Sequence, residues 1–551
     1  MYLDSSTVRH GDRAYTRHLL RESYREGKKV KHRTIANVSG CSPEEIEAIR
    51  LALRHKKDLQ KVMEQSIPVI LKQGLSVGAV WVLYETARRI GIVDALGETR
   101  QGKLALWQVM ARVIDQGSRL SAVRLAGSHA VCDVLNLEKF TEDDLYENLD
   151  WLCIHQGRIE EALFRNVQGS TAPGLFLYDV TSSYLEGTEN ELAAFGYNRD
   201  GKRGKRQIVI GLLCNEEGVP LSVEVFTGNT QDPKTIGPQI KKVAERFGAE
   251  GVTFVGDRGM IKSDQVKELG ESGFHYITAI TKPQIEVLLR QRVIQIGLFD
   301  EGLAEVSTAE GIRYVLRRNP ARAEEIRKSR DEKLTTLRKE CEKQNQYLRA
   351  HPRSSVAVAL QKVSGRSKQM NVSGWVTCGV NGRKITLSVD ADALREEAKL
   401  DGCYVLKTDL VDGAITKELI HNRYKDLRLV ESAFRSSKTV ELEMRPIHVR
   451  LATRTKGHVF VVMMAYRIIQ ELARRWQHLD VTIQEGINEL LSELCANEMT
   501  ITGATCNQIP QPRASIKNLM DAAQVQMPEV LPCKGVVVTT KKKLPLRRKM
   551  K

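Results

Sequence analysis

The sequence predicts an α/β protein with a mixed-sheet core, a β-rich insertion within that core, and a mostly helical domain before it. Three observations predict this architecture. Short apolar runs of strand length alternate with helix start signals between residues 170 and 281. The chain before them has helical periodicity over most of its length, and residues 282–400 break the alternation with β-like pieces. We therefore expect these segments: 1–165, 170–281, 282–400, 401–480 and 481–551.

The first segment combines a hairpin with helices. β-favouring residues flank the basic turn 25–29, which predicts a β-hairpin over residues 13–39. Ser42, Pro43 and Glu45 supply an N-cap, a first-turn proline and a capping-box glutamate for a helix that ends near residue 55. Helical periodicity follows from about residue 76 to 151, with a second start signal at Thr141. Residues 1–165 should form a separate, largely helical domain.

The core begins with an apolar run of buried-strand type. The pattern then gives three strands, a helix, a strand, a helix and a strand, an order that matches an α/β sheet of the RNase H-like kind. The predicted strands cover residues 175–180, 207–213, 221–226, 252–255 and 276–279, and the helices begin at Asp232-Pro233 and at Ser263.

The rest of the chain has weaker patterns. Within the insertion, a charged helical stretch from 321 to 349 lies among β-like pieces, which are residues 293–298, 313–317, 372–376 and 384–389. A strand over 402–410 and a helix near residue 424 return to the core, and residues 481–551 predict a helical region with a basic tail. From residue 534 the tail has eight basic and no acidic residues, which indicates either a disordered arm that contacts phosphate or a solubilising tail.

Composition points to a polyanionic partner. The 551 residues are too many for a single small binding module, and 84 lysines and arginines against 68 acidic residues give a formal charge of +16. Nucleic acid is the first candidate partner, with a merely solvated basic surface as the alternative. The ten scattered cysteines disfavour zinc and disulfide frameworks. Without a long apolar span or signal-peptide core, the protein should be soluble and cytoplasmic, with no membrane partner.

Two aspartates have the same sequence context. Asp179 and Asp257 each close an apolar strand. If those strands are parallel neighbours, their carboxylates lie side by side, and each raises the pKa of the other unless a cation lies between them. Carboxylate oxygens suit Mg²⁺ or Mn²⁺, and two ions about 3.5 to 4 Å apart can activate an attacking oxygen and stabilise a leaving oxygen at phosphorus. This chemistry requires a third carboxylate.

A predicted helix over residues 424–442 offers that carboxylate. Arg428, Glu431, Arg435 and Lys438 have spacings that place them on one helical face. Glu431 would complete the metal shell, while Arg428 and Lys438 would contact phosphates.

Each of these residues also has a structural explanation. The aspartates are common turn or helix caps, and Glu431 with Arg435 is an ordinary surface pair. Asp409, near the end of the strand 402–410, is a rival third carboxylate. His458, at the start of an apolar helix, is more simply a structural hydrogen-bonding residue than a general base.

A glycine-containing basic loop follows the first core strand. Residues 196–202 fit the spacing of a phosphate-binding loop as far as Lys202, but Arg203 stands where serine or threonine is needed and a strand follows instead of a helix. The sequence therefore disfavours ATP binding. It favours a basic hairpin that approaches DNA through Lys202, Arg203, Lys205 and Arg206.

Together these motifs resemble a known family. They are Asp179-Val-Thr-Ser, Gly196-Tyr-Asn-Arg-Asp-Gly-Lys-Arg, Phe226-Thr-Gly-Asn-Thr, Asp257-Arg-Gly-Met, and Tyr424 through Glu431 to Lys438 with Leu442-Glu-Met-Arg-Pro. The set resembles the DDE transposases of bacterial insertion sequences, in the superfamily of insertion sequence four, over roughly residues 10–475. The resemblance implies that Asp179, Asp257 and Glu431 are catalytic metal ligands.

It also implies that Tyr424 and Lys438 belong to the family's Tyr, Arg, Glu, Lys signature. Leu427 stands at the position of the signature arginine, so Arg428 is the candidate for that contact, and Arg258 joins it as a DNA-binding candidate.

The implied function is metal-dependent cut-and-paste transposition with two Mg²⁺ or Mn²⁺ ions per site. Its partners would be the double-stranded DNA of terminal inverted repeats and target sites, bound by a homodimer in a nucleoid-associated bacterial protein. The resemblance also suggests a hairpin intermediate on the element's ends. Two alternatives stay open: an RNase H-like nuclease that cleaves without joining, and a non-catalytic DNA-binding derivative.

Overall fold

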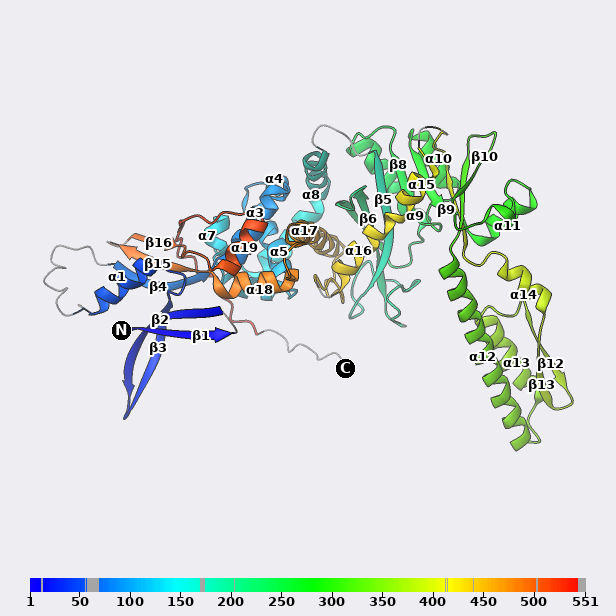
Figure 1. Cartoon of the computed structure of the whole chain (residues 1–551), viewed down its shortest axis with the longest axis horizontal. Helices are drawn as coiled ribbons and strands as arrows, with labels where there is room; N and C mark the ends of the chain where they lie inside the picture. The colour runs from blue at the N-terminus through cyan, green and yellow to red at the C-terminus, as the bar shows by residue number, and fades with distance from the viewer. Residues whose placement is uncertain are drawn as a thin grey trace. The chain divides into compact units, whose positions relative to one another are not determined.

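The computed structural model describes residues 1–10, 13–54, 56, 69–168, 174–202, 204–411, 413, 415–439, 441–501 and 504–543 (Figure 1). The chain divides into two compact units. The first unit comprises residues 1–173, 178–249 and 428–551, and the second comprises residues 174–177 and 250–427. Both therefore combine stretches that are distant in the sequence.

A large mixed β-sheet contains the predicted core. Its strand order is β10-β11-β14-β9-β8-β5-β6-β7, and β8 pairs with β9 in parallel. The strands are β5 (Leu175–Tyr184), β6 (Gln207–Asn215), β7 (Pro220–Thr227), β8 (Thr253–Gly256), β9 (His275–Ala279), β10 (Ala304–Ser307), β11 (Arg313–Arg318) and β14 (Cys403–Thr408). Helices α9 (Pro233–Lys241), continued by a π-helical turn over Lys242–Arg246, and α10 (Ser263–Glu271) fall where the sequence predicts them. The predicted order of core elements is confirmed.

In the first unit a long buried helix packs against the N-terminal helices. Helix α17 (Ala452–Trp476) lies against α8 (Glu142–Gln168), and both supply buried apolar side chains. The two backbones come close at Gly457, where a Cβ atom would stand 2.2 Å from the carbonyl oxygen of Leu149. Only glycine fits at this crossing, because the obstructing atom belongs to the backbone.

Gly457→Ala should therefore destabilise the protein. Forcing the helices apart costs about 1 to 3 kcal/mol of unfolding free energy, which urea denaturation followed by circular dichroism would measure. Gly365, inside helix α13 (Val356–Gln369) with open space around its Cβ position, is the matched control. Gly365→Ala should leave stability unchanged or raise it, because alanine is the better helix former. Equal stabilities for the two variants would contradict the prediction.

The N-terminal segment contains the predicted hairpin and a further strand. Strands β2 (Arg13–Glu26) and β3 (Lys29–Asn37) pair as a hairpin, and β1 (Tyr2–His10), which the sequence does not predict, adds a third antiparallel strand. Helix α1 (Pro43–Arg54) has the predicted capping box, because Ser42 Oγ accepts from Glu45 N at 3.2 Å and Glu45 Oε2 accepts from Ser42 N at 2.6 Å.

A second sheet joins the two ends of the chain. Strand β4 (Val69–Ser76) pairs antiparallel with β15 (Cys495–Ile501), and β16 (Ala504–Gln508) and β17 (Val530–Pro532) complete the order β17-β16-β15-β4. The helices of this part are α3 (Gly78–Arg89), α4 (Ile92–Leu96), α5 (Arg100–Ile114), α6 (Arg119–Ala126), α7 (Val131–Leu135), α18 (Ile483–Glu493) and α19 (Ala514–Ala522). The region after residue 481, predicted to be helical with a basic tail, contains α18 and α19 but also three strands that the sequence did not predict.

Part of the basic tail packs against the helices instead of forming a free arm. Val538 is buried, Lys534 N donates to Asp133 Oδ1 at 2.8 Å, and Lys542 pairs with Glu142. The expectation of a disordered arm is therefore wrong for residues 534–543. Residues 544–551 lie outside the described part of the chain.

The insertion is mostly helical, so the prediction of a β-rich insertion is wrong. Its helices are α11 (Lys282–Arg290), α12 (Pro320–Ala350), α13 and α14 (Ala391–Ala398), with one hairpin of β12 (Val376–Asn381) and β13 (Lys384–Val389). Leu337, Val363, Trp375 and Ile385 form a small apolar core among α12, α13 and the hairpin.

Two of the four β-like pieces are strands, because residues 384–389 form β13 and residues 313–317 extend the main sheet as β11. The other two were misassigned. Residues 293–298 end in a short 3₁₀ turn, Ile296–Leu298, and most of 372–376 precedes β12. Short apolar runs such as these do not distinguish strands from turns by periodicity alone.

No helix of the described residues is long and apolar enough to cross a membrane.

Candidate active site

Asp179 lies within β5 and on a defined face of it, so the prediction that this residue closes its strand is wrong. Tyr178, the residue before it, points toward α9 and donates its hydroxyl hydrogen to Thr235 O at 3.1 Å. Thr181, two residues after Asp179, accepts a hydrogen bond from Lys438 of helix α16 (Leu427–Lys438). Because side chains alternate along a strand, Asp179 shares the face of Thr181. Asp179 is half-buried, and its Oδ1 accepts from Val180 N at 2.7 Å.

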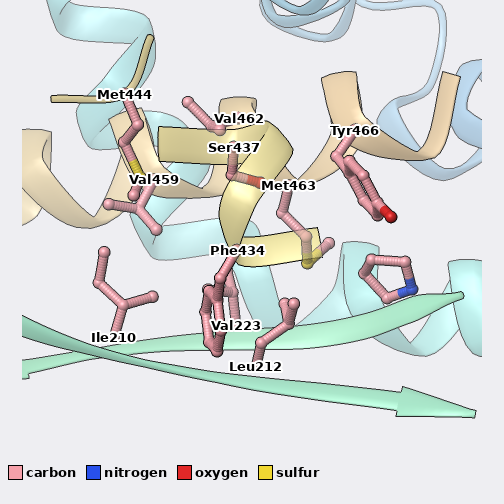
Figure 2. Close-up of a pocket in the computed structure, with 11 residues that line it drawn as sticks. Ile210, Leu212, Val223, Phe434, Ser437, Met444, Val459, Val462, Met463 and Tyr466 are labelled. Atoms are coloured by element: carbon pink, nitrogen blue, oxygen red, sulfur yellow. The ribbon is translucent and has the colours of Figure 1, made fainter. Parts of the chain in front are cut away.

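Helix α16 covers that side of the sheet and presents Glu431 to solvent. Its apolar side faces β6, β7 and α17 around a small pocket, lined among others by Phe434, Ser437, Ile210, Val223 and Met463 (Figure 2). Glu431, Arg428 and Arg435 are exposed. Within the described part of the chain, Glu431 forms no salt bridge with either arginine, so the ordinary surface pair considered from the sequence is not present. The carboxylate of Glu431 is open to a ligand.

Lys438 ends the same helix but is buried. Its Nζ donates to Thr181 Oγ1 and, at 3.1 Å, to Asp200 Oδ1. Burial lowers the pKa of Lys438 below its usual 10.5, and the charge of Asp200 acts in the opposite direction. The predicted phosphate contact of Lys438 stays a prediction, while the structure shows a second role, in which this lysine ties the end of α16 to β5.

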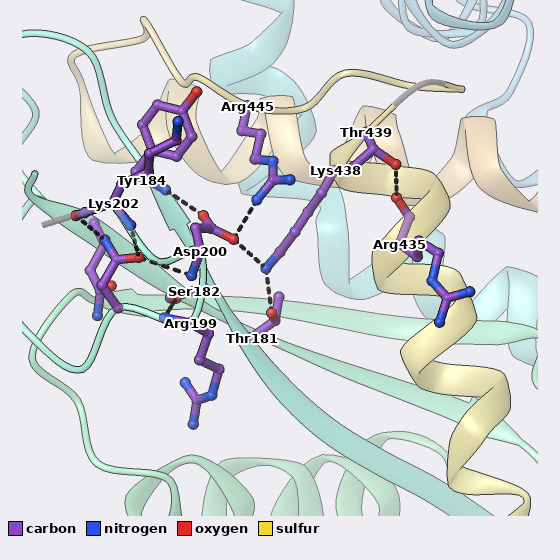
Figure 3. Close-up of polar contacts among 12 residues, drawn as sticks. Thr181, Ser182, Tyr184, Arg199, Asp200, Lys202, Arg435, Lys438, Thr439 and Arg445 are labelled. Carbon is purple, nitrogen blue, oxygen red and sulfur yellow. Dashed lines mark hydrogen bonds and ion pairs between the residues drawn. The ribbon is translucent and has the colours of Figure 1, made fainter. Parts of the chain in front are cut away.

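Asp200 is the centre of a buried polar cluster (Figure 3). Its side chain is 2% exposed, and Oδ1 accepts from Arg445 Nη1 at 2.6 Å as well as from Lys438. Oδ2 accepts from Tyr184 N at 3.1 Å. Asp200 is part of the basic motif described from the sequence, but no role was predicted for it. The one feature of the sequence that could have pointed to this role is the presence of an acidic residue among the cations of the loop.

Asp257 lies in the second unit, immediately after β8. It is exposed, and its Oδ1 accepts from Arg258 N at 2.7 Å and from Tyr424 Oη at 2.9 Å. Both hydrogen bonds that the described residues give this carboxylate therefore reach one oxygen, which leaves Oδ2 for another ligand.

Tyr424 and Glu431 are on separate helices, so the prediction of one helix over 424–442 is wrong. Tyr424 is near the end of α15 (Lys417–Lys425), and α16 begins at Leu427. Asp426, a weak helix former, stands between them and pairs with Arg423 at 3.5 Å.

Asp409 has a structural role. Its carboxylate accepts from Tyr276 N at 3.0 Å and lies 3.2 Å from His275 Nδ1. These contacts hold the residue beside β9, and no observation favours it as the third carboxylate.

Lys202 and Lys205 of the basic loop are exposed and Arg206 is half-buried, and all three hold defined positions. Lys202 Nζ lies 5.9 Å from the ring centroid of Tyr184, Lys205 pairs with Glu186 at 2.9 Å, and Arg206 Nη1 donates to Thr188 O at 3.0 Å. Arg203 lies outside the described residues. Arg258 and Arg428, the other predicted DNA contacts, are exposed.

The donor set suits a hard divalent cation, because all three predicted ligands are carboxylates. Asp179 and Glu431 belong to the first unit and Asp257 to the second. Among the described residues, no group of three or more His, Cys, Asp or Glu side chains is gathered as a ready metal site. A shared metal site of the three carboxylates stays a prediction.

His458 is buried beside two arginines. Arg119 Nη2 donates to its Nδ1 at 2.9 Å, so the imidazole is neutral at that nitrogen. Burial, followed by the charges of Arg112 and Arg119, lowers the pKa of His458 well below 6.5. This placement agrees with the structural role predicted for it.

That environment predicts a loss of stability in acid. Below about pH 6.5 the unfolded chain binds a proton at His458 while the folded chain does not, so the free energy of unfolding should fall as the pH falls. The contribution approaches about 1.4 kcal/mol per pH unit. Urea denaturation between pH 7 and pH 5 would measure it, with His458→Gln as the control. The two pH profiles should differ in slope; parallel profiles would rule out His458 as the cause.

Comparisons with known proteins identify the family of the chain. A family model described as IS1634 family transposase, N-terminal domain, matches residues 3–66, and one described as transposase DDE domain matches residues 171–468. No curated protein matches. A cryo-EM structure of the piggyBac transposase synaptic complex with hairpin DNA is 10% identical, with a TM-score of 0.33, and the match covers 76% of this chain and 69% of that one. Because the DDE match extends over more than half of its length, the chain belongs to the DDE-domain transposases of insertion sequences, enzymes that act on DNA.

Proposed function

We propose that this transposase cuts and joins DNA by metal-dependent phosphoryl transfer, with Asp179, Asp257 and Glu431 holding two Mg²⁺ or Mn²⁺ ions. The observation that carries the proposal is the placement of Asp179 on the face of β5 that α16 covers, with Glu431 open on that helix. Asp257, oriented by Tyr424 and open at Oδ2, supplies the third carboxylate.

Each residue has a distinct part in the chemistry. When bound, the ions would activate the attacking oxygen and stabilise the leaving oxygen at phosphorus. The three carboxylates hold the ions, and Tyr424 fixes the orientation of Asp257. Exposed Arg258 and Arg428 bind phosphates of the DNA strand. Water attacks first and frees a 3′-hydroxyl, which then attacks target DNA by direct displacement with no covalent enzyme intermediate.

The DNA partners follow from the same reaction. The N-terminal domain and the basic loop bind the terminal inverted repeats, and a homodimer on DNA brings two ends to one target. The net charge of +16 supports this by favouring contact with a polyanion. The affinity of the protein for DNA should fall steeply as the salt concentration rises.

A strand-transfer assay tests the reaction. Incubation with Mg²⁺, labelled element ends and a target plasmid should give joined product, and chelation of the metal should abolish it. Cleavage without joining would favour the nuclease alternative, and absence of both would overturn the proposal.

Iron-directed cleavage tests the shared metal site. Fe²⁺ with ascorbate and peroxide releases hydroxyl radicals that cut the backbone near a bound ion. Cuts near residues 179, 257 and 431 that Mg²⁺ suppresses are the expected result. Cuts near residue 257 alone would contradict a shared site.

Tyr424→Phe should lower the rate of DNA-end cleavage by about 10- to 100-fold, because hydrogen bonds that orient a metal ligand contribute about that much. The variant removes only the hydroxyl that donates to Asp257. Tyr404→Phe is the matched control, since that hydroxyl contacts His421 instead. Single-turnover cleavage of a labelled end would show the difference, and equal rates for the two variants would contradict it.

A further inference from the structure

The loop between β5 and β6 presents two aromatic side chains to solvent. Phe195 is 64% exposed and Tyr197 is 83% exposed. They are two residues apart in a loop that also carries Arg199, Lys202 and Lys205. Large exposed aromatic side chains that recur within a basic loop are characteristic of surfaces that bind single-stranded nucleic acid.

Hydrogen bonds to Gln207 fix the backbone of the loop where it carries the two rings. Ala194 and Gln207 exchange backbone hydrogen bonds of 3.1 and 3.0 Å. Gln207 Nε2 also donates to Tyr197 O at 3.0 Å. Gly196, between the two aromatics, lies so close to the next turn that a Cβ atom would stand 2.2 Å from Gly228 O. The rings therefore project from a fixed backbone.

The following residues anchor the loop on its other side (Figure 3). Arg199 N donates to Ser182 Oγ at 2.9 Å, and Asp200 is the centre of the buried cluster with Lys438 and Arg445. Ordering these residues is already part of folding, so a ligand that binds the exposed rings meets a preorganised surface and loses little of its affinity to ordering.

Each ring has an arginine beside it. Arg206 Cζ lies 5.6 Å from the ring centroid of Phe195, and Arg199 Cζ lies 5.7 Å from that of Tyr197. Both carboxylate oxygens of Asp232 hold Arg199, at 2.6 Å each. A ring with a cation near it and most of its surface open can stack a nucleobase, while the cations attract the phosphates on either side.

We propose that Phe195 and Tyr197 form a stacking platform for unpaired bases of the DNA on which the transposase acts. The inference rests on the proposed function only in taking DNA as the ligand. Ser182 anchors the platform to β5, because its Oγ accepts the hydrogen bond from Arg199 N. Stacking tolerates any base, because every base has a π-face.

Binding to single-stranded and duplex DNA separates stacking from phosphate contact. The probes are a fluorescein-labelled dT12 strand and a labelled 12-base-pair duplex, measured by fluorescence anisotropy with EDTA present so that the metal site takes no part. The variant is Phe195→Ala with Tyr197→Ala in the full chain. It should weaken binding of dT12 by about tenfold or more, from the effect of losing base stacking on aromatic rings, and change duplex binding by less than about twofold.

Matched variants control for general effects. Ile154, 76% exposed on α8, is an apolar residue outside the platform, and Ile154→Ala should leave both affinities unchanged. Tyr197→Phe keeps the ring and should retain dT12 binding. Lys205→Ala removes a charge and should weaken dT12 and duplex alike.

Each result of the binding measurements with dT12 and the duplex supports or overturns the platform. An unchanged affinity of the double variant for dT12 would overturn the platform, and so would an equal loss on both probes. Failure of the parent protein to bind either probe would overturn it together with the DNA partner. The metal site is judged separately, by cleavage in Mg²⁺, so a failure there leaves the EDTA binding result intact.

Discussion

Replacing Glu431 with glutamine should lower the rate of DNA-end cleavage by about a thousandfold or more and leave DNA binding intact. Metal-assisted charge stabilisation contributes several kcal/mol to such reactions, and about 4 kcal/mol corresponds to a thousandfold in rate. The substitution keeps the shape of a side chain that is exposed and forms no salt bridge with Arg428 or Arg435 in the described structure. The loss should therefore be chemical, with no change in fold.

Single-turnover cleavage of a labelled transposon end in Mg²⁺ gives the measurement. Glu147, an exposed acidic residue on α8, supplies the control, and Glu147→Gln should cleave at the parental rate. Asp257→Asn should reproduce the loss seen with Glu431→Gln. A rate within about tenfold of the parent for either ligand variant would remove that residue from the proposed metal shell.

Asp200→Ala should lower the free energy of unfolding by about 3 kcal/mol or more, a larger loss of stability than that expected for Gly457→Ala. The substitution leaves Lys438 and Arg445 facing each other in a cluster where their side chains are 9% and 26% exposed. A buried charge deprived of its partner typically costs about 3 to 5 kcal/mol. The loop 196–206 loses its anchor as well.

Urea denaturation of the purified protein measures this effect. Asp480→Ala, at an exposed position of the first unit, should be nearly neutral. Adding Lys438→Met to Asp200→Ala should restore part of the stability, because the second substitution removes one of the uncompensated charges. If Asp200→Ala were as stable as the parent, the cluster would not be what holds the loop, the helix and the strand together.

Local signals in the sequence predicted much of the fold. The strands of the core are apolar runs bounded by turn residues, and the helices after Asp232 and Lys262 start where the sequence indicates. The capping box of Ser42 and Glu45 is formed. Such features depend on neighbours within a few residues, so the sequence records them directly.

Pairings between distant segments could not be predicted in this way. Strand β4 pairs with β15, which comes from the other end of the chain, yet nothing in either segment specifies its partner. The sequence analysis did not predict helix α13 of the insertion, although Val356, Ala359 and Val363 have helical spacing. Gly365 inside this helix weakens the helical signal.

The candidate site shows the same division. Asp179 and Asp257 were recognisable because an apolar run precedes each of them, and Glu431 because of its cationic neighbours. The sequence did not show that β5 continues past Asp179 to Tyr184. The role of Asp200 could not be read from sequence, because Lys438 and Arg445 follow it by more than two hundred residues. Burial turned one acidic residue of a basic loop into the partner of two cations.

The sheet of β4 and β15 has a consequence for synthesis on the ribosome. Ser76 Oγ donates to Leu491 O at 2.8 Å, and Trp81 Nε1 donates to Gln526 O at 2.8 Å. These hydrogen bonds can form only after nearly the whole chain has been synthesised. During synthesis, the apolar surface of the N-terminal helices stays exposed until the last strands leave the ribosome. Premature termination upstream of β15 should therefore leave an aggregation-prone fragment and no partly working enzyme.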